Sequence, residues 1–230
     1  MKFKAIVLAV LAAVLFSGCC VLFPLPASKY QSRYGIIFRG ELVTEEKAKQ
    51  VDQILSELPP VVIESVRSIS VREYNDPHMG DNLGHCMFTR DICIACEGGC
   101  DECLEHVILH ESTHAYMYRL LSSRSNLEKA WLEIAGDIYR SRNKEKPFCL
   151  SFPKDGALSG YGATKWQEDI AETNAYIHSV VNGRKIEFFN YNNRPRFIAD
   201  RRFRKKLDFL LKYGFMSEET YKKFLALKYY

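Results

Sequence analysis

Two histidines four residues apart, His110 and His114, constrain the fold of this chain more than any other feature. They lie within a stretch from Asp101 to Leu121 whose apolar residues recur at helical spacing. On a helix, positions four apart differ by about 40° in azimuth and about 6 Å in height, so both imidazoles face the same way. Such a pair can bind one Zn²⁺ ion through two ring nitrogens. The sequence therefore predicts a helix with a metal-binding face.

The residue that follows the first of these histidines is Glu111, which completes a His-Glu-x-x-His pattern. A carboxylate at this place lies beside the open position of the metal and can take a proton from a bound water. With six histidines among 230 residues, chance produces such a pattern about 0.01 times per chain. We therefore expect Zn²⁺ as the cofactor and Glu111 as a general base. The alternative is a helix that merely exposes two histidines.

A catalytic zinc ion usually has three protein ligands and an exchangeable water, so a third ligand is needed. Glu168 and Glu172 are two carboxylates on one face of a helix expected at residues 167–181. One of them can ligate the metal, and the other can orient a ligating histidine through a hydrogen bond. Their apolar neighbours favour partial burial, where an uncompensated carboxylate is costly. We expect Glu168 to be the ligand; the alternative is a solvated acidic helix face.

These motifs together resemble the catalytic core of the gluzincin-type zinc peptidases related to anthrax lethal factor. The resemblance rests on His-Glu-x-x-His followed by an alanine and a tyrosine-rich stretch, and on Leu-Ser-Gly-Tyr-Gly-Ala-Thr at 158–164 followed by Glu-x-x-Ala-Glu at 168–172. It covers residues 104–181, about a third of the chain. It implies a set of roles: zinc ligation by His110, His114 and Glu168, water activation by Glu111, oxyanion stabilisation by Tyr161, and support of the ligands by Glu172.

The chemistry of Tyr161 agrees with the role that the resemblance implies. A phenol O–H is a suitable donor to a developing oxyanion, and a nearby metal lets it act without losing its proton. The alternative is an amphipathic aromatic side chain packed in a glycine-rich loop. Because the chain lacks the length for toxin delivery domains, the substrates of lethal factor are not carried over.

The first 18 residues predict a lipoprotein signal peptide. Two lysines precede an apolar run at residues 5–16, whose twelve residues span about 18 Å as a helix, short of the ~30 Å hydrocarbon core. The small residues before Cys19 resemble the bacterial lipoprotein cleavage box, which implies lipidation of Cys19 and a membrane-anchored location in the cell envelope. An ordinary cleaved signal, or an uncleaved one held in the membrane, is the alternative. Residues 19–40 then predict a tether, and residues 41–230 the metallopeptidase domain.

The coarse periodicity of the remaining chain predicts an α+β fold. Hydrophobic residues make up 47% of the sequence, which excludes disorder for the bulk of it. Strands are expected at residues 68–74 and 88–95, and helices at 44–58, 101–121, 127–140, 167–181, 197–213 and 217–227. Strands early and helices late predict a zincin-like domain, with a small sheet upstream of the metal-binding helix and a mostly helical C-terminal half.

Six of the eight cysteines, those beyond Cys19 and Cys20, allow a second kind of chemistry: Cys86, Cys93, Cys96, Cys100, Cys103 and Cys149. Two C-x-x-C pairs suit a tetrahedral structural metal, but only three residues separate them. An exported chain meets an oxidising compartment, in which six thiols tend to form three disulfides. Disulfides, a structural metal and free or redox-active thiols all remain open, and six cysteines allow 15 pairings.

The formal net charge of +4 is too weak to indicate a nucleic-acid-binding protein. A local basic run at residues 201–206 can mark a nucleic-acid or anionic lipid surface. We instead expect a solvated helix face, with Phe203 and Leu207 packed inward. The expected partners are a protein or peptide substrate and, through the lipid anchor, the membrane; no nucleic acid is expected, and the sequence does not determine the oligomeric state.

The sequence thus predicts a zinc-dependent endopeptidase tethered to a membrane surface. One alternative is a disulfide-rich extracytoplasmic binding lipoprotein with a structural or vestigial zinc site, which would have no need of Glu111 and Tyr161. Another is a thiol-redox lipoprotein built on the C-x-x-C pairs, which lack the βαβ context of such proteins.

Overall fold

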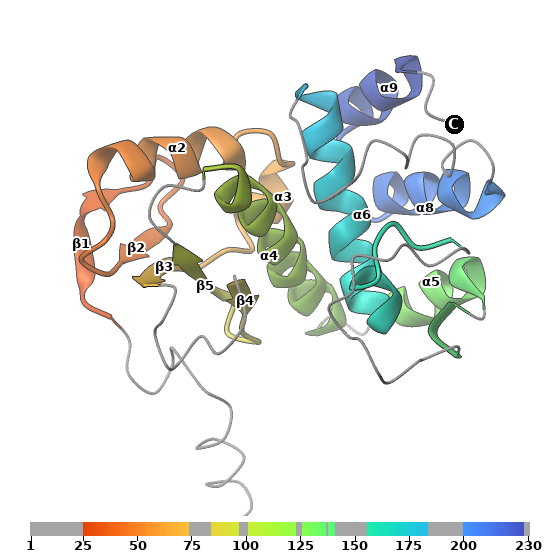
Figure 1. Cartoon of the computed structure of the whole chain (residues 1–230), viewed down its shortest axis with the longest axis horizontal. Coiled ribbons are helices and arrows are strands. Elements are labelled where there is room, and N and C mark those ends of the chain that lie inside the picture. The colour runs from red at the N-terminus through yellow and green to blue at the C-terminus, as the bar shows by residue number, and fades with distance from the viewer. Residues whose placement is uncertain are drawn as a thin grey trace, which may run out of the picture.

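The computed structural model describes residues 25–73, 84–96, 101–122, 126–136, 138–140, 156–183 and 200–227. The predicted signal peptide and Cys19 lie outside the described residues. A sheet with its covering helices and a mostly helical half meet along the long helix α4, Asp101–Ser122 (Figure 1).

The sheet has five strands in the order β1-β2-β3-β5-β4. Strands β2, β3 and β5 are parallel to one another, whereas β1 and β4 are antiparallel to their neighbours. In the centre, β3 and β5 pair Ile69 with Ile92 and Val71 with Ile94, and these four side chains are almost fully buried. The strand bounds are β1 Ala27–Gln31, β2 Ile37–Arg39, β3 Ser68–Glu73, β4 Gly84–Cys86 and β5 Asp91–Cys96.

Helix α2, Glu45–Leu55, lies over the sheet (Figure 1). The side chain of Thr44 accepts a hydrogen bond from the backbone N–H of Lys47, and two glutamates occupy the first turn, as expected for a helix start. The apolar residues of α2 recur at helical spacing and are buried in the same core as the sheet and α4. A short helix α3, Pro60–Ile63, connects α2 to β3.

The tether predicted at residues 19–40 is wrong from residue 27 onward, because β1 and β2 belong to the sheet. Phe38 is 2% exposed, and β2 pairs with β3 in parallel. Both strands are short, and Gly35 and Gly40 at the turns have positive φ angles of 75° and 102°. Strands this short show too little alternation of apolar and polar residues to be distinguished from a spacer in the sequence.

The strand predicted at residues 88–95 is correct only from residue 91. Residues 87–90 form a tight turn between β4 and β5, in which Arg90 N–H donates to the carbonyl of Met87 at 2.7 Å. Arg90 has a φ of 67°, in the left-handed region that glycine or asparagine usually occupies. Because residues 87–90 contain neither glycine nor asparagine, the sequence does not indicate the turn and predicts a continuous strand.

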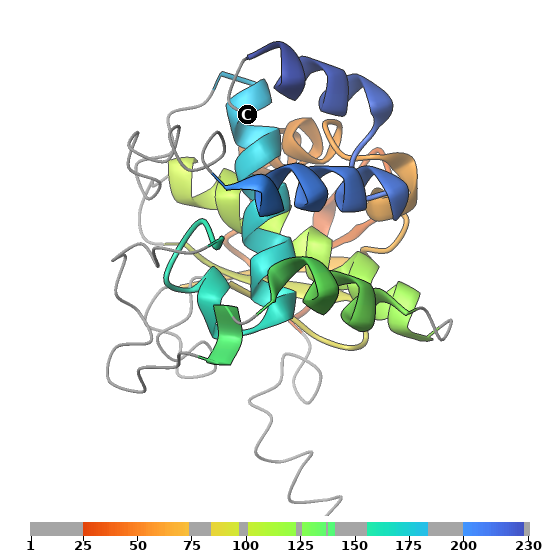
Figure 2. The same cartoon turned by 90° about the vertical axis from the view of Figure 1, so that its right-hand side faces the viewer.

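The second half is helical, and α6, Trp166–Val181, lies at its centre: 12 of its 16 residues are buried. Figures 1 and 2 show α6 between α4 and the C-terminal helices α8, Arg201–Lys212, and α9, Glu218–Ala226. Helix α5, Leu127–Ala135, and the 3-10 helices η1, Ile138–Arg140, and η2, Gly162–Thr164, complete the described elements. The α+β class, with a small sheet before the long helix and a mostly helical remainder, is confirmed.

One lysine of the basic run at 201–206 departs from the expected solvated face. Lys206 is 0% exposed, and its Nζ donates to Asp169 Oδ1 at 2.7 Å and to the carbonyl of Gly156 at 2.6 Å. Phe203 and Leu207 are buried, as expected. A long aliphatic stem lets Lys206 reach a buried acid from a helix position that periodicity assigns to the apolar face.

None of the helices in the described ranges has the length and apolar character needed to cross a bilayer.

Candidate metal centre

Three side chains from two helices converge on one point. Glu168 Oε2 lies 3.2 Å from His110 Nε2 and 3.1 Å from His114 Nε2, and the two Nε2 atoms lie 3.0 Å apart. Ligand atoms about 2.0–2.1 Å from a tetrahedral zinc lie about 3.3 Å from one another. The spacing therefore fits a single zinc ion held by these three residues.

The chemistry of this cluster also fits a cation. Both Nε2 atoms lie within hydrogen-bond distance of the same carboxylate oxygen and of each other. To donate to Glu168, each nitrogen must carry a proton, and the contact between the two nitrogens then has no acceptor. Burial alone would raise the pKa of Glu168, but hydrogen bonds from His110 and His114 hold it well below its usual range. The carboxylate is thus ionised, and a divalent cation satisfies all three groups at once.

The packing of α6 on α4 brings the ligands together. The side-chain amide of Asn174 on α6 donates to the hydroxyl oxygen of Thr113 on α4 at 2.9 Å. Ala115 on α4 and Ala171 and Ala175 on α6 are all 0% exposed, and their small size lets the helix backbones approach closely. His110 and His114 are buried, whereas the Glu168 side chain keeps 12% of its surface exposed, so solvent reaches the cluster beside Glu168.

Glu172 lies one helical turn after Glu168 and holds His110 from the other side of its ring. Glu172 Oε1 is 3.0 Å from His110 Nδ1 and 3.0 Å from His106 Nε2. This carboxylate therefore orients the His110 ring so that Nε2 faces His114 and Glu168. His106, His110 and Glu172 are also close enough to hold a metal ion, so they form a second candidate cluster that shares His110 with the first.

The pKa of His110 reflects the two carboxylates on either side of it. Burial alone would lower the pKa of this imidazole, but hydrogen bonds with Glu168 and Glu172 raise it to about 10. Histidines in turn hold the pKa of Glu172 well below its usual range, although burial acts in the opposite direction. The cluster is therefore rich in negative charge, which favours a divalent cation over a neutral ligand.

Glu111 is buried beside strand β4, next to the cluster. A Cβ atom placed on Gly84 of β4 would lie 3.3 Å from Glu111 Oε1 and only 2.3 Å from a methyl group of Val107. Only glycine lets β4 approach α4 this closely, and the approach encloses the Glu111 side chain, which is 6% exposed as a residue.

Tyr161 lies on the His110 side of the cluster, with its ring centroid 5.8 Å from that of His110. It is 38% exposed, so its phenol borders solvent. Burial, the negative charges of Glu168 and Glu111, and a hydrogen bond with the Glu168 carboxylate raise the pKa of Tyr161 well above its usual range. The phenol therefore stays protonated and can donate a hydrogen bond.

The loop that carries Tyr161 is tied to Glu172 through Ser159, a residue to which the sequence assigns no role. The Ser159 hydroxyl donates to Glu172 Oε2 at 2.7 Å and accepts from the backbone N–H of Gly162 at 2.9 Å. The sequence signal for this contact is a serine three residues before the 3-10 helix, because serine side chains often accept hydrogen bonds from nearby backbone N–H groups.

Two aromatic residues that the sequence does not single out lie on the His114 side. The rings of Tyr118 and His114 stack with centroids 6.4 Å apart, and Phe88 of the β4–β5 turn packs on Tyr118 at 4.4 Å. Burial and the nearby Cys86, Glu111 and Glu168 raise the pKa of Tyr118 to about 12.

Among the six candidates, Cys86 and Cys93 are the cysteines whose side chains lie within the described residues. Cys86 carries a free thiol rather than a disulfide, and its Sγ contacts the carbonyl oxygen of Met87 at 3.5 Å. Burial, and then the charge of Glu111, raise its pKa well above the usual value, so it is a poor nucleophile. Cys93 is fully buried on the adjacent strand. The side chains of Cys96, Cys100, Cys103 and Cys149 lie outside the described residues, and their pairing stays a prediction.

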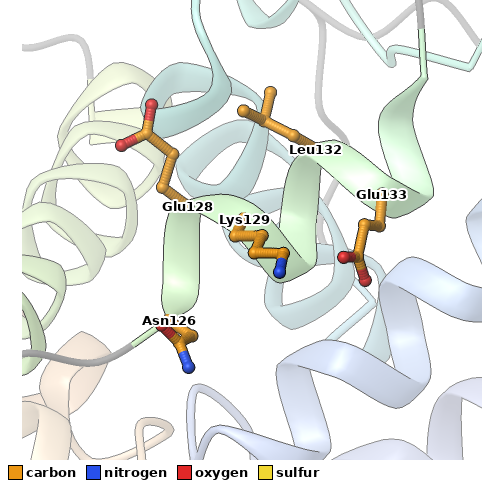
Figure 3. Close-up of a pocket in the computed structure, with 5 residues that line it drawn as sticks. All are labelled: Asn126, Glu128, Lys129, Leu132 and Glu133. Atoms are coloured by element: carbon orange, nitrogen blue, oxygen red, sulfur yellow. The ribbon is translucent and has the colours of Figure 1, made fainter.

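A separate hollow of about 600 Å³ lies along α5, lined by Asn126, Glu128, Lys129, Leu132 and Glu133 (Figure 3). None of its lining residues belongs to the metal cluster. Its lining residues come from α5 and its N-cap and present no convergent set of polar groups, so it does not form part of the site.

Comparison of the chain with protein-family models, with curated proteins and with solved structures finds no match.

Proposed function

We propose that this chain is a zinc-dependent endopeptidase with a zincin-like fold. The observation that carries the proposal is the convergence of His110, His114 and Glu168, whose ligand atoms lie 3.0–3.2 Å apart. Two imidazoles and one carboxylate form the ligand set of catalytic zinc sites that keep a further position for water or substrate. The resemblance to gluzincin-type peptidases supports the same assignment.

The residues around the cluster supply the other groups that peptide hydrolysis needs. When bound, zinc supplies a nucleophilic water at neutral pH and polarises the peptide carbonyl. Glu111 takes up a proton as water attacks and passes it to the leaving amine. The protonated phenol of Tyr161 donates a hydrogen bond to the carbonyl oxygen as negative charge develops on it.

A purely structural zinc site explains these features less well. Structural sites enclose the metal with four protein ligands, whereas the described residues bring three to this cluster. A structural site also has no use for a buried carboxylate at Glu111 or for a solvent-bordering phenol at Tyr161. A thiol-redox function is disfavoured at Cys86, whose raised pKa keeps it protonated.

We also propose that the peptidase works outside the cytoplasm, as a lipoprotein anchored through Cys19. The signal-like residues 1–18 and the small residues before Cys19 support this location. Metabolic labelling with a fatty-acid analogue tests it: Cys19→Ser should abolish the label. A chain that stays unlabelled before the substitution contradicts the anchor and leaves the peptidase proposal intact.

Metal content and peptide hydrolysis in the Glu111→Gln variant test the enzymatic proposal. Glutamine keeps the shape of the side chain but cannot accept the proton, so the variant should hold one zinc per chain and lose hydrolysis by about 100-fold to 10,000-fold. The measurements are elemental analysis and cleavage of a quenched fluorescent peptide library, with a chelator as control. Undiminished turnover in the variant removes Glu111 from the mechanism, and absence of chelator-sensitive cleavage by the wild-type protein overturns the function.

A further inference from the structure

The turn between β4 and β5 holds an apolar side chain at a fixed position beside the metal centre. Two backbone hydrogen bonds close the turn: Arg90 N–H to the Met87 carbonyl at 2.7 Å, and Met87 N–H to the Asp91 carbonyl at 3.0 Å. At the base of the turn, Asp91 accepts hydrogen bonds from the Ser68 hydroxyl at 2.6 Å and from Arg67 Nε at 2.9 Å. The turn is therefore short, hydrogen-bonded and anchored to the neighbouring strand.

Phe88 projects from this turn and is 81% exposed, more than any other large hydrophobic residue in the described ranges. Turns of this kind usually carry glycine, proline, asparagine, aspartate or serine. A large ring displayed to solvent from an anchored turn contributes little to the core, and together with the adjacent Tyr118 it presents apolar surface beside the metal cluster.

Tyr118 connects Phe88 to the metal cluster. The Phe88 and Tyr118 ring centroids are 4.4 Å apart, and the Tyr118 ring stacks on that of the proposed ligand His114 with an interplanar angle of 23°. His114, Tyr118 and Phe88 form a continuous aromatic row from the cluster to solvent.

Tyr161 packs near the other proposed histidine ligand, with its ring centroid 5.8 Å from that of His110. A peptide held with its cleaved bond at the metal would therefore lie near a polar phenol beside His110 and near the aromatic row beside His114. A substrate side chain next to the cleaved bond that reaches this row meets the rings of Tyr118 and Phe88.

We propose that Phe88 and Tyr118 form an apolar subsite that selects peptides with an aromatic or large aliphatic side chain next to the cleaved bond. The inference rests on the proposed peptidase function. Covering the exposed Phe88 ring with an apolar side chain removes apolar surface of both partners from water, which favours such a substrate over one with alanine. Differences of this kind are worth about 10-fold to 200-fold in kcat/KM.

The test uses peptide pairs identical except for phenylalanine or alanine at one position on either side of the cleaved bond. The ratio of kcat/KM between the two peptides is measured for the full chain and for Phe88→Ala. The wild-type ratio should exceed about tenfold at one position and fall toward one in Phe88→Ala. Because Phe88 is exposed, the variant should keep its thermal midpoint and its zinc content, which are measured alongside.

Leu132→Ala is the matched control, because Leu132 is also a partly exposed apolar residue but lies on α5 along the separate hollow. Its peptide ratio should equal that of the wild type. An unchanged ratio in Phe88→Ala overturns the subsite, including the case in which the variant loses only binding to lipid vesicles, which would make Phe88 a membrane contact. Absence of cleavage of every peptide by the wild type overturns the peptidase function instead, and the subsite with it.

Discussion

The hydroxyl of Ser159 donates a 2.7 Å hydrogen bond to Glu172, and this contact joins the loop that carries Tyr161 to the carboxylate that orients His110. The proposed ligand and the proposed oxyanion donor thus share one support. Replacement of Glu172 should affect zinc binding through His110, whereas loss of the Ser159 hydroxyl should affect the position of Tyr161. Mutation can therefore separate the two effects.

Replacement of Ser159 with alanine should lower kcat about tenfold with little change in KM. The variant frees the Gly162 N–H and so loosens the start of the 3-10 helix beside Tyr161, which then donates less well to the developing oxyanion. Steady-state kinetics on a fluorescent peptide, with zinc affinity measured in parallel, checks this. Ser159→Thr, which keeps a hydroxyl, should recover most of the rate; an equal loss in both variants contradicts the positioning role.

Replacement of Glu172 with glutamine should weaken zinc binding by about 10-fold to 100-fold, because a neutral amide holds the His110 ring less firmly and removes a negative charge behind it. Competition with a fluorescent chelator measures the affinity. The control is Glu218→Gln, which removes an exposed acid that pairs with Lys222 on α9. Equal affinity in the Glu172 variant and the control shows that Glu172 does not support the metal.

The metal-free protein should lose stability as the pH rises from about 7 to about 10. Burial disfavours the charged form of His110, yet Glu168 and Glu172 raise its pKa from 6.5 to about 10 in the folded state. A raised folded-state pKa stabilises the protein fully below the unfolded value and loses that stabilisation as the pH rises through about 10. Urea unfolding in the presence of a chelator measures the effect.

The matched variant for this pH dependence is Glu168→Gln, which removes one of the two carboxylates that raise the His110 pKa. Its free energy of unfolding should fall less steeply over the same pH interval. If the wild-type and variant curves run parallel, His110 does not carry an elevated pKa in the folded chain.

Replacement of Lys206 with alanine should lower the free energy of unfolding by about 3–5 kcal/mol, because Asp169 is then buried without a positive partner. Asp169 also accepts from Trp131 Nε1 at 3.0 Å and Tyr139 at 2.5 Å, so the loss affects the contacts of α5 and η1 with α6. Chemical denaturation measures it. Lys205→Ala, at the exposed neighbouring position, should change the stability by less than about 0.5 kcal/mol; similar losses in both variants contradict a specific buried pair.

The elements with strong local periodicity could be predicted from the sequence, and the elements defined by distant partners could not. Helices α4 and α6 carry long apolar repeats, so their bounds lie within about two residues of expectation, and their motif residues His110, His114 and Glu168 lie together. Strands β1 and β2 are short, and β2 forms a strand because β1 and β3 pair with it on either side.

Side chains whose role depends on tertiary contacts also escaped prediction. Lys206 reads as part of a charged run, and only the position of Asp169 on another helix makes burial of its ammonium group favourable. Phe88 reads as the start of a strand, and its place in a turn next to Tyr118 follows from the left-handed backbone at Arg90. Nothing within a few residues of either position signals these outcomes.

The ligand cluster draws its histidines from the helix that covers the sheet and its carboxylate from the central helix of the other half. A bound ion would therefore cross-link α4 to α6, in addition to contacts between them such as the hydrogen bond from Asn174 to Thr113. Removal of the ion by a chelator should therefore increase amide hydrogen exchange in the Glu168 turn of α6 before it does so in β3. Metal binding would in this way stabilise the packing of α6 on α4.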